Sequence, residues 1–179
     1  MQYIDEHWGG HIFLIGGLSL GGQILVEMLA QNPSFCEYAI IESACIIPSK
    51  LTNILIKPML DMSFWLIKKK WFAKLQFKSL KIKSDLFQNY YEDTCKISKQ
   101  DMIAFMKANT SYSCMKEISR TTSKVTVVVG AKEQSNMISS ARKLQQMIPG
   151  SSLSIKDKLC HGEYSINHPA EYAEYIICL

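Results

Sequence analysis

A serine between two glycines is the first feature of this 179-residue chain that could do chemistry. Ser19 stands at the centre of the segment GLSLG, after the apolar run HIFLI and before apolar residues at helical spacing. A serine on such a sharp strand-to-helix turn is accessible, and the positive dipole end of the following helix favours negative charge beside it. The spacing therefore predicts that Ser19 is a nucleophile.

Two other interpretations of this stretch stay open. The glycines could serve a structural turn alone, because chance produces this pattern in about one chain in twenty of this length. Residues 12 to 30 are also nearly long enough to cross a bilayer, and Gly17 and Gly21 have the spacing of a helix-dimer motif. Gln23 and Glu27 interrupt the run, however, and no Lys or Arg precedes it, which disfavours a membrane span.

A nucleophilic serine needs a histidine as its base. His7 and His11 precede the strand expected at the serine, and His168 stands before Pro169, which fits the first turn of a terminal helix. His161 instead follows an alternating segment that indicates a late strand, so its loop can approach a serine at the carboxyl edge of the same sheet. We select His161, with an ordinary loop histidine as the alternative.

Two glutamates compete for the role of orienting the histidine. Glu133 follows the apolar run VTVVVG, which predicts a buried strand, and precedes a helix expected from about residue 135. Glu42 ends the run YAIIE and so also stands at the carboxyl end of a strand. We prefer Glu133 and keep Glu42 as its rival, while either could be a solvated loop charge.

Three segments together resemble the α/β-hydrolase superfamily, in the broad group of serine esterases, lipases and related acyl hydrolases. They are HIFLIGGLSLGG, VTVVVGAKE and LCHGEYSINHPAEYAEYI. Their order along the chain, with Ser19 first, Glu133 second and His161 last, is the order of the family's catalytic residues. The resemblance implies an α/β class fold, a partial α/β-hydrolase fold with a mostly parallel sheet flanked by helices.

The resemblance also implies roles for individual residues. Ser19 would be the nucleophile, His161 the general acid and base, Glu133 the carboxylate, and Leu20 the donor of one oxyanion amide. No metal and no organic cofactor is implied. The implied function is cleavage of a carboxylic ester or related acyl bond of a small molecule through an acyl-enzyme intermediate.

One departure from the family limits this expectation. The family's strand before the serine is usually the fifth, and the region before it donates the second oxyanion amide, whereas only about ten residues precede that strand here. We therefore expect an N-terminally incomplete fold, and the alternative function is a weak or inactive remnant that acts in binding or assembly. The exposed strand would then lie at the sheet edge, which predicts pairing of two copies.

The expected organisation is a hydrolase core in two parts, residues 1–47 and 122–179, with a helical lid inserted at residues 48–121. Charge separates these parts, because residues 1–49 contain five acids and no Lys or Arg. Residues 50–83, in contrast, contain nine Lys and a single acid. The insertion is therefore the basic part of the chain.

Three uses of this basic insertion compete. As a lid, it would turn Trp65, Trp71 and Phe72 toward an acyl-binding pocket. As a peripheral patch, its mixed aromatics and lysines would contact an anionic membrane or attract anionic substrates. Nucleic-acid binding is disfavoured, because no recognised module surrounds the lysines.

Composition sets the remaining limits. With 47% hydrophobic and 20% charged residues, the chain has the composition of a globular protein and not of a disordered one. Its six cysteines form no C-x-x-C pair, and the first residues lack the basic start of a secretory signal. We therefore expect a reduced, cytoplasmic location.

Overall fold

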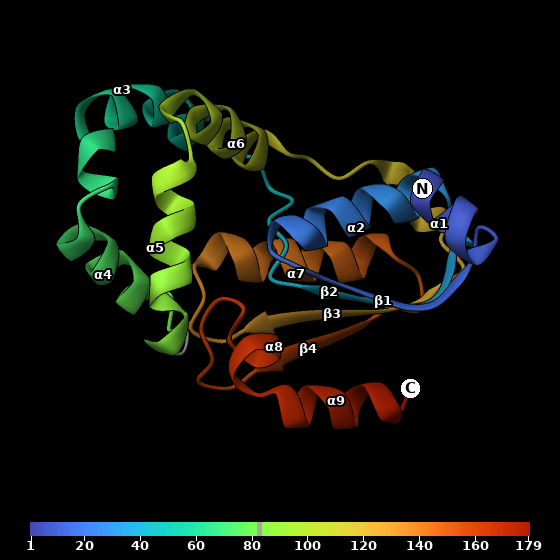
Figure 1. Cartoon of the computed structure of the whole chain (residues 1–179). Coiled ribbons are helices and arrows are strands. Elements are labelled where there is room, and N and C mark those ends of the chain that lie inside the picture. Colours follow the sequence, from blue (N-terminus) through green and yellow to red (C-terminus); the bar gives the residue numbers. More distant parts are fainter. Residues whose placement is uncertain (82–83) are drawn as a thin grey trace. The chain divides into compact units, whose positions relative to one another are not determined.

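The computed structural model describes residues 1–81 and 84–179, which form two compact units. The sheet unit consists of Met1–Ile47 and Tyr112–Leu179, and the helical unit of Pro48–Ser111 (Figure 1). The insertion thus ends at Ser111, whereas the sequence predicted residue 121. The difference arises because Ile118 is fully buried in the core of the sheet unit.

Four strands form one parallel sheet in the order β1-β2-β3-β4. Their bounds are β1 Ile12–Leu18, β2 Cys36–Glu42, β3 Lys124–Gly130 and β4 Ser152–Lys156. This arrangement confirms the predicted parallel sheet, and it brings the carboxyl ends of all four strands to one edge. β1 is longer than the predicted run of residues 11–15, because Gly16 and Gly17 continue the pairing with β2.

Helices cover both faces of this sheet (Figure 1). They are α1 Gln2–Trp8, α2 Leu20–Gln31, α7 Ser135–Met147, α8 Glu163–Asn167 and α9 Pro169–Ile177, with a short 3₁₀ helix at Lys116–Arg120. Val127 and Val129 of β3 pack with residues of α2 and α7, while Val128 packs with residues of α8 and α9. The run of valines is therefore apolar throughout because both of its faces are covered.

The helical unit contains α3 Lys50–Ile67, α4 Lys70–Ser79, a 3₁₀ helix at Ser84–Leu86, α5 Phe87–Lys96 and α6 Lys99–Ser111. Ile56 and Leu60 of α3 form its small core with Met102 and Met106 of α6. The side-chain amide of Asn53 donates to the carbonyl of Lys107 at 2.8 Å. The beginning of α3 is thus tied to the last turns of α6, so the two ends of the inserted segment lie together.

The apolar stretch at residues 12 to 30 is a strand followed by a helix, so its interpretation as a membrane span is wrong. Within the described part of the chain, no helix is long and apolar enough to cross a membrane. All six cysteines are free thiols.

Candidate active site

Ser19 occupies a strained turn between β1 and α2. Its backbone has φ 55° and ψ −112°, a conformation that costs a non-glycine residue free energy, and its N–H donates to the carbonyl of Glu42 at 2.8 Å. A Cβ at Gly17 would lie 2.4 Å from the carbonyl oxygen of Gly21. The turn therefore requires glycine at position 17 and presents the serine at the carboxyl edge of the sheet.

The second glycine of the pattern is not required in the same way. A Cβ at Gly21 would meet nothing within 4 Å, whereas one at Gly22 would lie 2.9 Å from Cβ of Ala44. Steric crowding therefore does not require glycine at position 21. The residue that lets α2 approach the end of β2 is Gly22.

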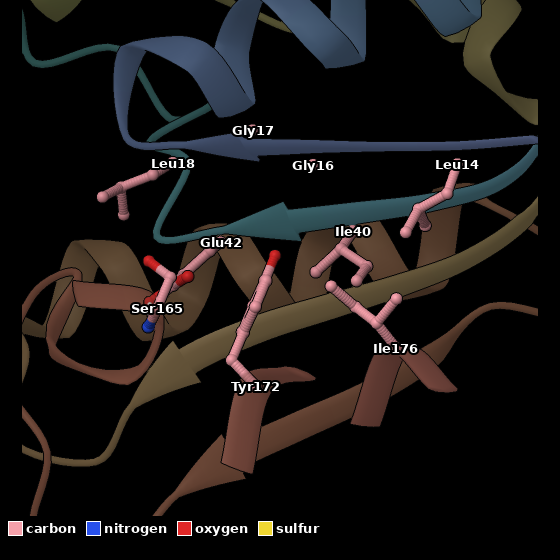
Figure 2. A pocket seen from close by; sticks show the side chains of 9 residues that line it. All are labelled: Leu14, Gly16, Gly17, Leu18, Ile40, Glu42, Ser165, Tyr172 and Ile176. Carbon is pink, nitrogen blue, oxygen red and sulfur yellow. Dashed lines mark hydrogen bonds between the residues drawn. The ribbon is translucent and has the colours of Figure 1, made fainter. Parts of the chain in front are cut away.

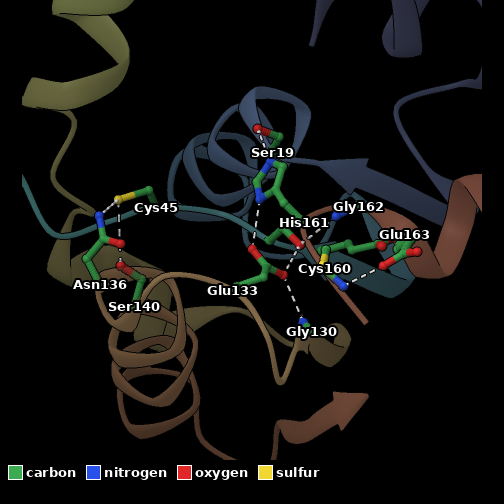
Figure 3. A network of polar contacts seen from close by, with 12 residues as sticks. Ser19, Cys45, Gly130, Glu133, Asn136, Ser140, Cys160, His161, Gly162 and Glu163 are labelled. Atoms are coloured by element: carbon green, nitrogen blue, oxygen red, sulfur yellow. Dashed lines mark hydrogen bonds and ion pairs between the residues drawn. The ribbon is translucent and has the colours of Figure 1, made fainter. Parts of the chain in front are cut away.

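Ser19, His161 and Glu133 form a chain of hydrogen bonds (Figure 3). Nε2 of His161 lies 3.0 Å from Oγ of Ser19, and Nδ1 lies 2.7 Å from Oε2 of Glu133. The Glu133 side chain is only 1% exposed, whereas the His161 side chain is 46% exposed. A carboxylate at Nδ1 favours the tautomer in which Nδ1 carries the proton, so Nε2 is left as an acceptor for the serine hydroxyl.

The Glu133 carboxylate is held by further donors. Burial by itself would raise the pKa of Glu133, but hydrogen bonds from His161, Ser43 and the N–H of Gly130 together lower that pKa below its ordinary value. The Gly130 N–H donates to Oε1 at 2.8 Å. Glu133 is therefore ionised at neutral pH, the form that accepts a proton from Nδ1.

Ser43 is a member of this network that sequence analysis missed. It is buried, its φ is 53°, and its hydroxyl donates to Oε1 of Glu133 at 2.7 Å. The N–H of Gly162 lies 3.4 Å from the same hydroxyl, which links Ser43 to the loop that carries His161. The sequence signal at Ser43 is its position directly after β2, and that position alone does not indicate a contact with Glu133.

The loops that carry the acid and the histidine are held against each other. The N–H of Lys132 donates to the carbonyl of Leu159 at 3.0 Å, and a Cβ at Gly130 would lie 2.4 Å from that same oxygen. The N–H of Cys160 donates to the Glu163 carboxylate at 2.6 Å. The contacts of Lys132 and Gly130 with Leu159 fix the spacing of the two loops, and a side chain at position 130 would force the loops apart.

Glu42, the rival acid, has different surroundings. Its carboxyl is buried, Oε1 accepts from the N–H of Ser165 at 3.3 Å, and Oε2 has no hydrogen-bond partner among the described residues. Burial raises the pKa of the Glu42 carboxyl. It lines a cavity of about 320 Å³ together with Tyr172 (Figure 2). The structure brings Glu133, and not Glu42, into hydrogen-bonding distance of His161.

The sequence also singled out Leu20 and two further histidines, whose surroundings differ. Leu20 is the first residue of α2, so its N–H is one of those that a helix cannot use internally. Nδ1 of His168 lies 3.4 Å from Glu171 in the first turn of α9. Nδ1 of His7 lies 3.0 Å from the carbonyl of Tyr3. Neither His7 nor His168 contacts Ser19.

The three aromatic residues expected to line a lid do not share one environment within the helical unit. Trp65 is 59% exposed and Trp71 is 63% exposed. Phe72, in contrast, packs against the small core of the unit. Their contact with a substrate stays a prediction.

Among the described residues, no group of three or more His, Cys, Asp or Glu side chains could hold a metal ion. No model of a known protein family matches the sequence, and no curated protein matches it. Solved structures do match the fold. An esterase from Exiguobacterium antarcticum has a TM-score of 0.77 at 15% identity, and the match covers 99% of this chain and 69% of the esterase.

Two further solved structures are similar in the same way. A bromoperoxidase from Bacillus anthracis has a TM-score of 0.76 at 13% identity, with 99% of this chain and 70% of the other covered. The 2-hydroxy-6-oxo-6-phenylhexa-2,4-dienoate hydrolase from Rhodococcus sp. strain RHA1 has a TM-score of 0.73 at 12% identity, with 96% and 65% covered. The chain therefore has an α/β-hydrolase fold and spans about two thirds of the length of these structures.

Proposed function

We propose that this chain carries the catalytic centre of a serine hydrolase that cleaves a carboxylic ester or a related acyl bond. The observation that carries the proposal is the pair of hydrogen bonds on His161, at 3.0 Å to the Ser19 hydroxyl and 2.7 Å to the Glu133 carboxylate. The name of one similar structure, an esterase, supports the same class of reaction, and the name of another, a dienoate hydrolase, supports hydrolysis.

In the proposed reaction, Oγ of Ser19 attacks the carbonyl carbon while its proton passes to Nε2 of His161. Glu133 stabilises the resulting imidazolium, and the Leu20 N–H donates to the developing oxyanion. The protonated Nε2 then gives its proton to the leaving alcohol, which departs from the acyl-enzyme. Water, deprotonated by the same nitrogen, attacks the acyl-enzyme and releases the acid and free Ser19.

A fluorophosphonate probe tests the nucleophile, because it labels an activated serine whatever the natural substrate. We expect labelling of the unchanged protein and turnover of p-nitrophenyl acetate, both abolished by Ser19→Ala. Ser139→Ala, a change on the exposed side of α7, is the matched control and should keep both. Labelling that survives Ser19→Ala would overturn the assignment. A folded protein with neither labelling nor turnover would favour a binding remnant.

A further inference from the structure

The helix α3 carries an apolar face that is not buried in the helical unit. Ile56, Leu60 and Ile67 lie on its inner face and form the small core of that unit. The opposite face is also apolar from the first turn to the last, and its side chains are 44% to 80% exposed. We call this face the apolar stripe; it consists of Leu51, Ile54, Leu55, Met59, Met62 and Trp65.

The stripe is uninterrupted along the helix. Its members recur at the three- and four-residue spacing of one helical face, and Pro58, on the same face, is exposed as well. The polar residues of α3, among them Lys57 and Ser63, stand outside it. The indole N–H of Trp65 donates to the carbonyl of Met62 at 3.1 Å, so the ring lies along the helix. Exposed apolar surface of this extent marks an interaction site.

The helical unit that carries the stripe has a net positive charge. The helical unit has twelve Lys and five Asp or Glu, a formal charge of +7, whereas the sheet unit has a formal charge of −3. Asp61, the single acid of α3, is paired with Lys57 at 2.7 Å and Lys99 at 2.9 Å. The one negative charge of this helix is therefore neutralised by its neighbours.

The next helix repeats this combination of apolar and cationic side chains. Trp71 and Leu75 of α4 are each 63% exposed. Lys74 and Lys78 lie one turn apart on the same helix, are exposed, and form no ion pair with a described residue. Exposed apolar side chains beside free cations thus continue beyond α3.

We propose that the helical unit docks on the surface of an anionic lipid bilayer, with the apolar stripe of α3 at the boundary of headgroups and acyl chains and the lysines among the headgroups. A lipid surface fits better than a protein partner because the stripe offers no polar group that would fix the orientation of a folded partner, while its charge complements anionic lipid. The docking is peripheral, and it is independent of any reaction at Ser19.

Co-sedimentation of the full chain with vesicles tests this docking. We expect binding to vesicles with about 30 mol% phosphatidylserine that is at least about tenfold tighter than binding to pure phosphatidylcholine, and weaker with added salt. Met62→Glu places a charge in the stripe. Thr52→Glu adds the same charge to α3 outside the stripe, and it completes a capping box with Ser49, so it keeps the helix stable.

The difference between these two variants measures the contribution of the stripe, because both add one negative charge. Met62→Glu should bind anionic vesicles about tenfold more weakly than Thr52→Glu. The double change Lys74→Gln and Lys78→Gln should lower the preference for anionic lipid about tenfold and leave binding to neutral vesicles unchanged. Circular dichroism verifies that each variant is folded.

Three outcomes would overturn the proposal. They are no binding to either vesicle, equal losses in Met62→Glu and Thr52→Glu, and light scattering that shows a dimer dissociated by Met62→Glu in the absence of vesicle binding. The last result would mean that a second copy covers the stripe. None of these readouts uses catalytic activity, so a failure here and a failure of the proposed hydrolase are distinguishable.

Discussion

The sheet unit and the helical unit distribute their polar and apolar groups in opposite ways. In the sheet unit the central strands β2 and β3 are covered on both faces, and the polar side chains at the carboxyl edge bond to one another. The helical unit buries few apolar residues and exposes a continuous stripe on α3. The function proposed for the sheet unit therefore depends on the positions of individual atoms. The function proposed for the helical unit depends on the composition of its surface.

This contrast has a consequence for mutations. Where function depends on atom positions, replacing one oxygen in the network has a large effect. Where function depends on composition, only a change of charge or polarity has an effect, and one apolar residue can replace another. Substitutions at four positions in the sheet unit test this contrast.

The largest effect is expected at Glu133. Glu133→Gln keeps the size of the side chain but turns an acceptor into a group that also donates, so it favours the wrong tautomer of His161. Activity on p-nitrophenyl acetate should fall about 10⁴-fold. The matched variant Glu42→Gln should keep most of the activity, because Glu42 does not contact His161. If Glu42→Gln is the inactive variant instead, Glu42 is the acid.

A smaller effect is expected at Ser43, which contacts the acid. Ser43→Ala removes one of the hydrogen bonds that lower the pKa of Glu133, so kcat should fall about 10- to 100-fold with KM little changed. As the pH is lowered, Ser43→Ala should lose activity at a higher pH than the unchanged protein, because the pKa of its Glu133 carboxylate is higher. Ser139→Ala should keep the original pH profile, and an unchanged profile in Ser43→Ala would exclude this role.

These two positions also show what the sequence could predict. The proximity of Glu133 and His161 could be predicted, because each follows a predicted strand and the carboxyl ends of parallel strands share one edge. Ser43 could not, since its role depends on a positive φ and on which strands are neighbours. The different roles of Gly21 and Gly22 likewise depend on how closely α2 approaches the end of β2.

In the fold, too, some features could be predicted from the sequence and others could not. The valine run of β3 predicts a strand covered on both faces, and it is one. The end of the insertion at Ser111 could not be predicted, because Ile118 joins the core of the sheet unit from a segment without a clear apolar period. Local pattern thus predicts an element, whereas long-range packing decides to which unit a short connecting segment belongs.

The sheet unit also exposes apolar side chains, among them those at the outer edge of β1. Phe13 is 61% exposed there and lines a groove of about 670 Å³ with Tyr3 and Trp8. We propose that two copies of the chain pair along this edge. Phe13→Lys should weaken self-association about tenfold in light scattering. Ile155→Lys, on the opposite border strand β4, is the control, and equal weakening by both would contradict pairing through β1.

The smallest effect is expected at Glu42, where the polar network of the sheet unit is incomplete. Burial raises the pKa of Glu42 in the folded state above its ordinary value of 4.5, so the charged form favours unfolding. Its contribution to stability is therefore fully present below pH 4.5 and is lost as the pH rises through the folded-state pKa. Glu42→Gln keeps an acceptor for the Ser165 N–H and removes the charge.

Glu42→Gln should therefore raise the free energy of unfolding by about 1 kcal/mol at neutral pH and have little effect near pH 4, as measured by urea denaturation. Glu133→Gln should instead lower the free energy of unfolding at neutral pH. Its pKa is lowered by its donors, so its carboxylate stabilises the fold above pH 4.5, and that stability is lost as the pH falls through the folded-state pKa. If both variants changed the free energy of unfolding equally at both pH values, ionisation of neither carboxyl would contribute to stability. The difference in hydrogen bonding between Glu133 and Glu42 would then have no effect on the stability of the fold.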